Sequence, residues 1–228
     1  MPRSARLAPG GVVFHVLNRA VARQVISCAD GDYRAFERLL AELLAETTVR
    51  LFTYCLMPTH WHFVLQPTRD GELSAFMQRL TTTHVRRWRL FRENVGDGHL
   101  YQGTFKSFPI ETDEHFLTVC RYVERNPARA RLVERAEDWR WGGLWRRLRP
   151  NPMPQAPVLS VWPVDAPDNW VERVNRPETL AELDELRECL KRGRPYGSPA
   201  WQATTAEQLG LDSSFHPRGR PLGWRKAK

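Results

Sequence analysis

The sequence predicts an α+β fold in which one antiparallel sheet carries helices on one face. Short apolar runs rich in β-branched and aromatic residues alternate with longer segments whose apolar residues recur at helical spacing. Two neighbouring runs are separated only by Met57-Pro58-Thr59, as in a hairpin. The chain has 228 residues, 42% of them hydrophobic, which is enough for one domain with a sizeable core.

The first part of the chain supplies three strands and one helix. Residues 11–18 are predicted to form a strand, and residues 49–56 a second one. Between them, residues 32–47 carry apolar side chains at helical spacing. Residues 60–66 form the third strand after the Met57-Pro58-Thr59 break, so we expect the second and third strands to pair.

The next elements complete the sheet. Residues 73–91 are predicted to form an amphipathic helix, and residues 104–110 a fourth strand. Thr112-Asp113-Glu114 then provides a cap and an acidic first turn for a helix that Pro127 interrupts. The order strand, helix, strand, strand, helix, strand is the split β-α-β arrangement of a ferredoxin-like sheet.

Composition changes after Arg149. Several prolines between residues 150 and 167 predict an extended linker or a strap across the surface. Beyond them, residues 178–191 read as a helix, and Ser198-Pro199 starts another that Gly210 ends. The expected organisation is a main domain (1–149), a proline-rich linker or strap (150–177), a helical C-terminal extension (178–212) and a basic tail (213–228) that is disordered without an anionic partner.

Charge narrows the functional class. Lysine and arginine total 34 against 26 acidic residues, and a net charge of +8 favours nucleic-acid binding. No stretch approaches the roughly 20 apolar residues of a membrane span. No apolar signal-peptide core follows the basic N-terminus, and the four cysteines form no Cys-x-x-Cys pair. We therefore expect a cytoplasmic protein with no membrane contact.

His60 and His62 are the first candidate site residues. Side chains two apart on a strand point to the same face, so the third strand presents both imidazoles together, with Trp61 on the other face. Two imidazoles on a rigid strand supply most of a divalent-cation site. The alternative is a polar pair that packs under a helix.

The interrupted helix carries Tyr122 and Asn126. Residues four apart on a helix are neighbours, so the phenol and the amide share a face. A phenol can serve as a nucleophile while an amide oxygen completes a metal site. Two simpler interpretations are that Tyr122 packs at the core edge and that Asn126 caps a new short helix that starts at Pro127.

Several segments resemble the single-tyrosine transposases of the HUH superfamily, and within that group the REP-associated tyrosine transposases. Residues 54–65, which include His60-Trp61-His62, are similar to their signature strand-turn-strand. Thr59 stands where that family usually has asparagine. The other similar segments are residues 14–19, 105–107, 121–130, 192–198 and 209–213.

The resemblance implies that His60, His62 and Asn126 bind Mg²⁺ or Mn²⁺ and that Tyr122 is the nucleophile. Attack by the phenol would release a 3′-hydroxyl and leave the 5′-phosphate on the enzyme. Rejoining then needs no ATP, and the sequence has no phosphate-binding Gly-x-x-x-x-Gly-Lys-Ser/Thr motif. The implied partner is single-stranded DNA with a REP-like hairpin in the bacterial nucleoid. The implied state is a monomer, with a dimer as the alternative.

Arginines are the candidate DNA contacts. The outer face of the predicted helix 73–91 is expected to present several that suit a phosphate backbone, unless that face is simply solvated. The basic tail contains a Pro-Arg-Gly-Arg-Pro segment that resembles an AT-hook core and suits AT-rich duplex. These candidates are Arg79, Arg86, Arg87, Arg89, Arg218 and Arg220.

Two other functions remain open from the sequence. One is a catalytically silent DNA-hairpin-binding protein or regulator that kept the fold. The other is a metal-dependent hydrolase in which Tyr122 only packs. A covalent protein–DNA adduct would separate both from a tyrosine transposase.

Overall fold

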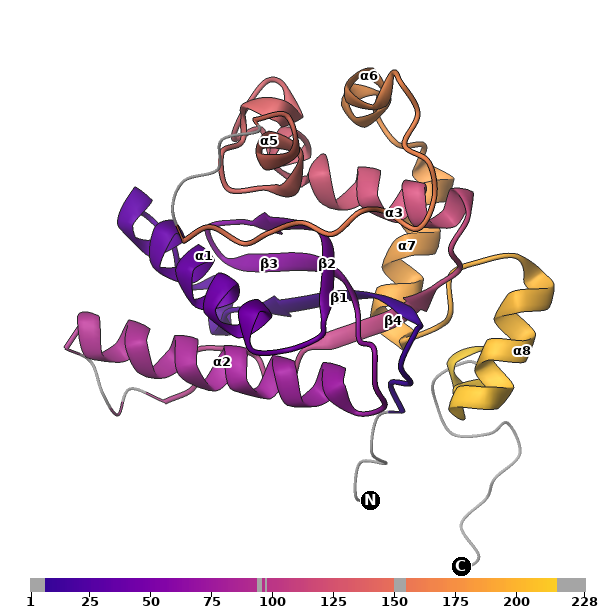
Figure 1. Ribbon diagram of the computed structural model, residues 1–228, viewed down its shortest axis with the longest axis horizontal. Coiled ribbons are helices and arrows are strands. Elements are labelled where there is room, and N and C mark those ends of the chain that lie inside the picture. Colours follow the sequence, from indigo (N-terminus) through magenta and orange to yellow (C-terminus); the bar gives the residue numbers. More distant parts are fainter. Residues whose placement is uncertain (1–6, 94–95, 97, 150–154, 217–228) are drawn as a thin grey trace, which may run out of the picture.

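A four-stranded antiparallel sheet lies at the centre of the computed structural model, which describes residues 7–93, 96, 98–149 and 155–216. The strand order is β2-β3-β1-β4 (Figure 1). This order belongs to the split β-α-β arrangement, so the predicted α+β class and ferredoxin-like sheet are confirmed. The strands are β1 (Val13–Arg19), β2 (Arg50–Leu56), β3 (His60–Gln66) and β4 (Lys106–Ile110).

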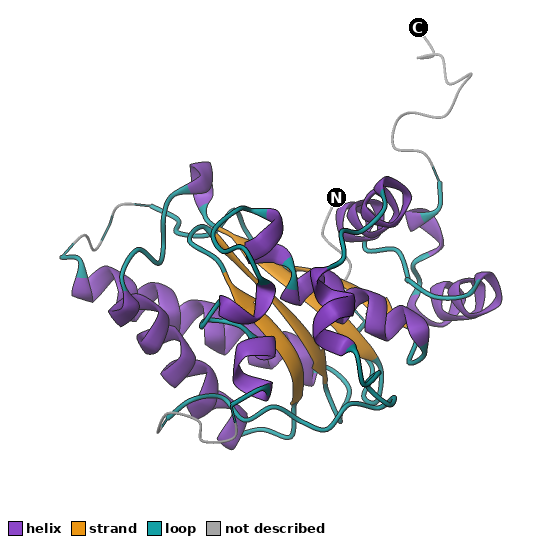
Figure 2. Ribbon diagram, turned by 90° about the horizontal axis from the view of Figure 1, so that it is seen from above, coloured by secondary structure: helices purple, strands orange, loops and turns teal. Residues whose placement is uncertain are grey.

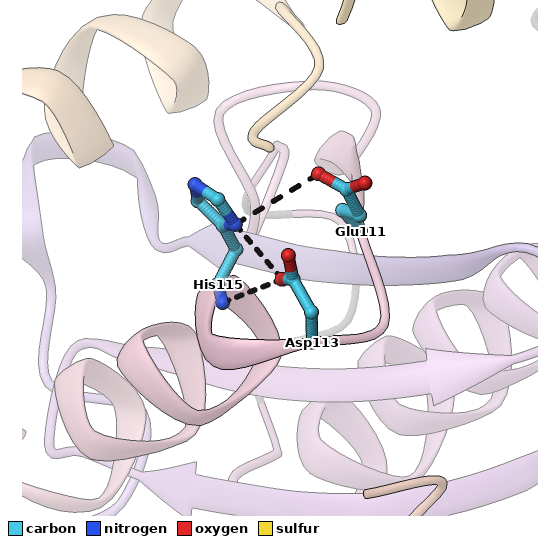
Figure 3. A group of neighbouring side chains, drawn as sticks. All are labelled: Glu111, Asp113 and His115. Atoms are coloured by element: carbon cyan, nitrogen blue, oxygen red, sulfur yellow. Dashed lines mark hydrogen bonds and ion pairs between the residues drawn. The ribbon is translucent and has the colours of Figure 1, made fainter. Parts of the chain in front are cut away.

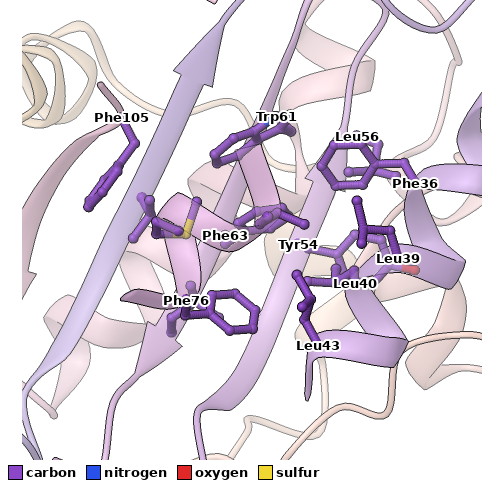
Figure 4. Packing of buried hydrophobic residues seen from close by; sticks show 14 of the residues in the cluster. Phe36, Leu39, Leu40, Leu43, Tyr54, Leu56, Trp61, Phe63, Phe76 and Phe105 are labelled. Carbon is purple, nitrogen blue, oxygen red and sulfur yellow. The ribbon is translucent and has the colours of Figure 1, made fainter. Parts of the chain in front are cut away.

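The helices that follow β1 and β3 cover one face of the sheet. These are α1 (Asp30–Ala45) and α2 (Glu72–Phe91). Phe36 of α1, Phe63 of β3 and Phe76 of α2 belong to one buried cluster on this face (Figure 4). The alternation of β3 sends Trp61, Phe63 and Leu65 into this cluster and leaves the histidines for the other face.

The opposite face is also covered, which corrects the expectation of helices on one face. Helices α3 (Glu114–Glu124) and α5 (Gly143–Arg147) lie there, and Figure 2 shows helices on both sides of the strands. The physical reason is that the strands are apolar on both sides. Phe52, Val64 and Phe108 form a second cluster with side chains of α3, and such a face must be covered.

A close approach at Gly143 fastens this second layer to β2. A Cβ atom at Gly143 would lie 2.1 Å from Thr53 Oγ1 and 3.0 Å from the Tyr54 backbone nitrogen, so the site accepts only glycine. The Thr53 hydroxyl donates to the buried Glu124 carboxylate (2.6 Å), which also accepts from Trp170 Nε1 (2.8 Å). These contacts hold the C-terminal end of α3 against the sheet.

The chain beyond residue 149 packs on the second layer. The backbone nitrogen of Ser160 donates to the Leu51 carbonyl (2.7 Å), and Trp162 Nε1 donates to the Phe52 carbonyl (3.0 Å). The described part of the proline-rich segment is therefore a strap along β2. The other helices are α4 (Asn126–Arg129), α6 (Trp170–Asn175), α7 (Leu180–Arg192) and α8 (Pro199–Leu209), with 3-10 turns η1 (Val21–Arg23), η2 (Ala136–Asp138) and η3 (Asp212–Ser214).

In the described part of the chain, helices are too short or too polar to cross a membrane.

Candidate active site

His60 and His62 lie side by side on β3, on the face that α3 covers. Their ring centroids are 5.1 Å apart. His62 is buried (2% exposed), whereas His60 at the start of the strand is partly exposed. The Nδ1 atom of His60 lies 3.1 Å from the Thr59 hydroxyl. Access to the pair is therefore from the His60 side.

A third histidine, His15 of β1, completes the group, and the sequence analysis gave it no role. Its Nε2 atom lies 2.9 Å from His62 Nδ1, and its ring stacks on that of His62 at 5.1 Å. The side chain is fully buried, and its Nδ1 atom has no hydrogen-bond partner among the described residues. A buried unpaired polar atom costs stability, which is a common feature of functional sites. A histidine in an otherwise apolar strand was the available signal.

Burial holds these imidazoles in the neutral form. It lowers the pKa of His15 to about 3. Burial, then the nearby charges of Arg19 and Arg129, lowers the pKa of His60 to about 4. The pKa of His62 is held well below its usual value by burial and by the neighbouring histidines and arginines. Neutral imidazoles keep a lone pair, which is the state that binds a metal ion.

We expect the free energy of unfolding of the metal-free protein to decrease as the pH falls below about 6.5. His15 and His84 each have a pKa lowered to about 3 by burial, so only the unfolded chain binds their protons in this range. Each such histidine lowers the free energy of unfolding by up to about 1.4 kcal/mol for each unit by which the pH falls. Urea unfolding at several pH values measures the slope, which His84→Gln should reduce. A pH-independent stability would contradict neutral buried histidines.

Tyr122 lies in the last turn of α3, next to the histidines. Asp113 caps the helix by accepting from the His115 backbone nitrogen (2.8 Å), and Phe116, Val119 and Val123 bury its apolar side. The Tyr122 ring packs in a T-shaped arrangement against two histidine rings. The distance between ring centroids is 5.8 Å to His62 and 6.0 Å to His15. The structure thus brings the predicted nucleophile and the predicted histidine pair together.

Two other tyrosines are held by hydrogen bonds on the opposite face of the sheet. The Tyr101 hydroxyl lies 2.7 Å from His84 Nδ1 and accepts from Trp61 Nε1 (3.0 Å). Burial raises the pKa of Tyr101 well above its usual value. Tyr54 donates to the Glu37 carboxylate. By contrast, the Tyr122 hydroxyl makes no hydrogen bond to the described residues.

The short helix expected near Pro127 is present as α4, but Asn126 is its first residue rather than its cap, which is Arg125. The Nδ2 atom of Asn126 donates to the Tyr122 carbonyl (3.1 Å), and its Oδ1 atom accepts from Arg129 Nη2 (2.6 Å). The side chain is buried. The amide therefore lies beside Tyr122, with its oxygen directed at a guanidinium.

The arginines predicted on α2 lie on the sheet face opposite Tyr122. Arg79 pairs with Glu46 (2.5 Å) and Arg87 with Glu42 (2.8 Å), both of which involve exposed side chains. Arg86 is exposed. The expectation that Arg89 lies on the outer face of the helix is wrong, because its side chain is buried and donates to the Gly98 carbonyl (3.0 Å). A role of α2 in DNA binding stays a prediction, and Arg218 and Arg220 lie outside the described residues.

Glu111, Asp113 and His115 form another group with the ligand types of a metal site (Figure 3). Their atoms have structural partners. His115 Nδ1 lies 2.8 Å from Asp113, and Glu111 accepts from the backbone nitrogen of Ser198 (2.6 Å), at the start of α8. The group follows β4 at the end of the sheet away from His60, about 20 Å along β1. It serves to cap α3 and to anchor α8.

A protein-family model also matches the part of the chain that contains these residues. The family model described as "Transposase IS200 like" matches residues 11–126, just over half of the chain. The chain belongs to the IS200-like transposase family. The matched segment contains β1, the histidine pair, Tyr122 and Asn126.

This transposase also resembles a solved structure in its fold. It is similar to the structure of a REP-associated tyrosine transposase bound to a REP hairpin, with 16% identity, 74% of this chain and 93% of that chain covered, and a TM-score of 0.53. A transposase candidate from Deinococcus radiodurans R1 shares 16% identity over 54% of this chain and 96% of that one, with a TM-score of 0.39. The first likeness supports the fold. No curated protein matches the chain.

Proposed function

We propose that this transposase is a metal-dependent single-stranded DNA endonuclease and strand transferase that works through a 5′-phosphotyrosine intermediate. The observation that carries the proposal is the grouping of Tyr122 with His62 and His60 on one face of the sheet. The proposed substrate is hairpin-forming repeat DNA, because the structural relative that shares this fold is bound to a REP hairpin.

The proposed reaction begins at the Tyr122 hydroxyl. The phenol oxygen attacks phosphorus in line, the bond from phosphorus to the 3′-oxygen breaks, and the phenol proton ends on the released 3′-hydroxyl. The DNA 5′-phosphate stays on Tyr122 as a phosphodiester. A 3′-hydroxyl that attacks this ester reverses the step and joins two strands without an added energy source.

The donor atoms suit a divalent cation, for which we propose Mg²⁺ or Mn²⁺. The Nδ1 atoms of His60 and His62 are taken by Thr59 and His15, which leaves both Nε2 atoms without a hydrogen-bond partner among the described residues. Asn126 Oδ1 is the proposed third ligand, since a carbonyl oxygen has a second lone pair beside the Arg129 contact. When bound, the cation would polarise a non-bridging oxygen of the scissile phosphate.

His15 is proposed to set the tautomer of His62. A ligand Nε2 atom requires the proton on His62 Nδ1, so His15 Nε2 must accept it. We expect His15→Leu to weaken Mn²⁺ binding about 10–100-fold, whereas His15→Gln, which keeps an acceptor, loses less. Isothermal titration calorimetry with Mn²⁺ and DNA-free protein measures both, and equal affinity of His15→Leu and wild type would contradict the role.

A denaturing gel tests the proposed function. The transposase is incubated with Mn²⁺ and a single-stranded hairpin oligonucleotide labelled on the 3′ side of the cleavage point. A band of covalent protein–DNA adduct is expected. A free 5′-phosphate product without adduct would indicate the hydrolase, and intact bound DNA would indicate the catalytically silent hairpin-binding protein.

A further inference from the structure

Glu178, which lies between the strap and α7, contacts the end of the helix that carries Tyr122. Its side chain is 1% exposed. One carboxylate oxygen accepts from Arg125 Nη1 and the other from Arg129 Nη1, both at 2.9 Å. A buried carboxylate is stable only when it is paired, and two arginines achieve this here. Glu178 lies outside the segment 11–126 that the family model matches, and its ion pair with Arg129 connects it to α4.

Arg129 extends this contact to the candidate site. Its Nη2 atom donates to Asn126 Oδ1 (2.6 Å), and its guanidinium carbon lies over the Tyr122 ring at 4.3 Å from the centroid. One planar group thus hydrogen-bonds to Glu178 and to Asn126 and lies over the Tyr122 ring. Arg125 shares Glu178, but among the described residues its guanidinium makes no contact of this kind with the Tyr122 ring.

We propose that Glu178 and Arg129 are positioning residues of the transposase. Glu178 holds the Arg129 guanidinium in place, and this guanidinium orients both the Tyr122 ring and the Asn126 amide. The inference rests on the proposed function, because it assigns a purpose to the geometry of Tyr122. It makes the C-terminal extension a part of the active site.

Charge and shape both favour this arrangement over a merely structural ion pair. Two arginines against one carboxylate leave one net positive charge beside Tyr122, where the proposed phosphate has to arrive. The guanidinium of Arg129 donates to two acceptors while its carbon lies over the ring, and a lysine ammonium lacks this planar fork. In-line attack tolerates little misplacement of the nucleophile.

The test compares Arg129→Met with Arg125→Met, since each removes one cation from Glu178. We expect single-turnover cleavage to fall about 100-fold in Arg129→Met and less than about 3-fold in Arg125→Met. The dissociation constant for the hairpin should change only a few-fold in both. Arg129→Lys keeps the charge and should not restore the rate. Equal rates in the two methionine variants, or faster cleavage in Arg129→Met, would overturn the proposal.

A second measurement needs neither metal nor DNA. In protein with ¹³C-labelled tyrosine rings, the Tyr122 resonance is identified by its loss in Tyr122→Phe. It should shift in Glu178→Gln and Arg129→Met but not in Glu182→Gln, because Glu182 pairs with Arg121 instead (2.5 Å). An unmoved Tyr122 resonance in Arg129→Met refutes the positioning role even if wild type cleaves DNA. Absence of any adduct in wild type refutes the proposed function, while the resonance still reports on Arg129.

Discussion

Tyr122→Phe should abolish cleavage and the covalent adduct together, with a loss of more than about 10⁴-fold. The substitution removes the one oxygen that can attack phosphorus and keeps the ring that packs beside His62 and under Arg129. The hydroxyl makes no hydrogen bond to the described residues, so the free energy of unfolding should change by less than about 1 kcal/mol. Hairpin binding should persist.

Tyr101→Phe is the matched control for this prediction. Tyr101 is a buried tyrosine whose hydroxyl is hydrogen-bonded to Trp61 and His84 inside the other core. Its loss should destabilise the fold by about 1–3 kcal/mol and leave cleavage intact. Tyr122→Phe should therefore lose cleavage and keep stability, whereas Tyr101→Phe should lose stability and keep cleavage. A nucleotide found by mass spectrometry on Tyr101, with Tyr122 unmodified, would show that the nucleophile is misassigned.

Local periodicity predicted much of this geometry. Alternation on a strand placed His60 and His62 on one face, and helical spacing placed Tyr122 near Asn126. Both are properties of short segments. The strand order followed from the succession of elements, and the family resemblance agreed with it.

What the sequence did not predict depends on contacts between distant segments. His15 meets His62 only because β1 pairs with β3, 47 residues away. Glu178 meets Arg129 across 49 residues through the fold of the strap. Arg89 belongs to a stripe of α2 that is polar in sequence, yet its side chain is buried and donates to the Gly98 carbonyl. Spacing along one element carries no signal for such pairs.

The apolar second face of the sheet was missed for a related reason. The strands carry large side chains on both sides, as Phe52 and Phe63 show, and only one side was assigned a partner. Helix α3 was predicted as an element, but the predicted arrangement had helices on one face of the sheet only. The position of α3 over β2 and β3 is what brings Tyr122 to the histidines.

His60→Ala and His62→Ala should each lower cleavage about 10³-fold or more, because each removes a proposed ligand of the cation that polarises the scissile phosphate. Hairpin binding should be largely retained, since it rests on phosphate and base contacts elsewhere. His62→Ala should also cost stability, because it leaves a cavity and removes the partner of His15 Nε2. His60 is partly exposed, so His60→Ala separates the two effects and is the cleaner variant.

In wild-type protein, EDTA should lower cleavage as much as the histidine substitutions do. Added Mn²⁺ should restore cleavage by the wild type but not by His60→Ala. Calorimetry with Mn²⁺ and DNA-free protein gives a reading that does not depend on activity. His60→Ala should lose Mn²⁺ affinity, whereas His115→Ala should keep it, because His115 belongs to the group that caps α3. Mn²⁺ binding that vanishes in His115→Ala and survives in His60→Ala would move the metal site to the other end of the sheet. Undiminished cleavage in EDTA would exclude a metal role for His60 and His62. Their neutral imidazoles would then supply no positive charge to stabilise the phosphate.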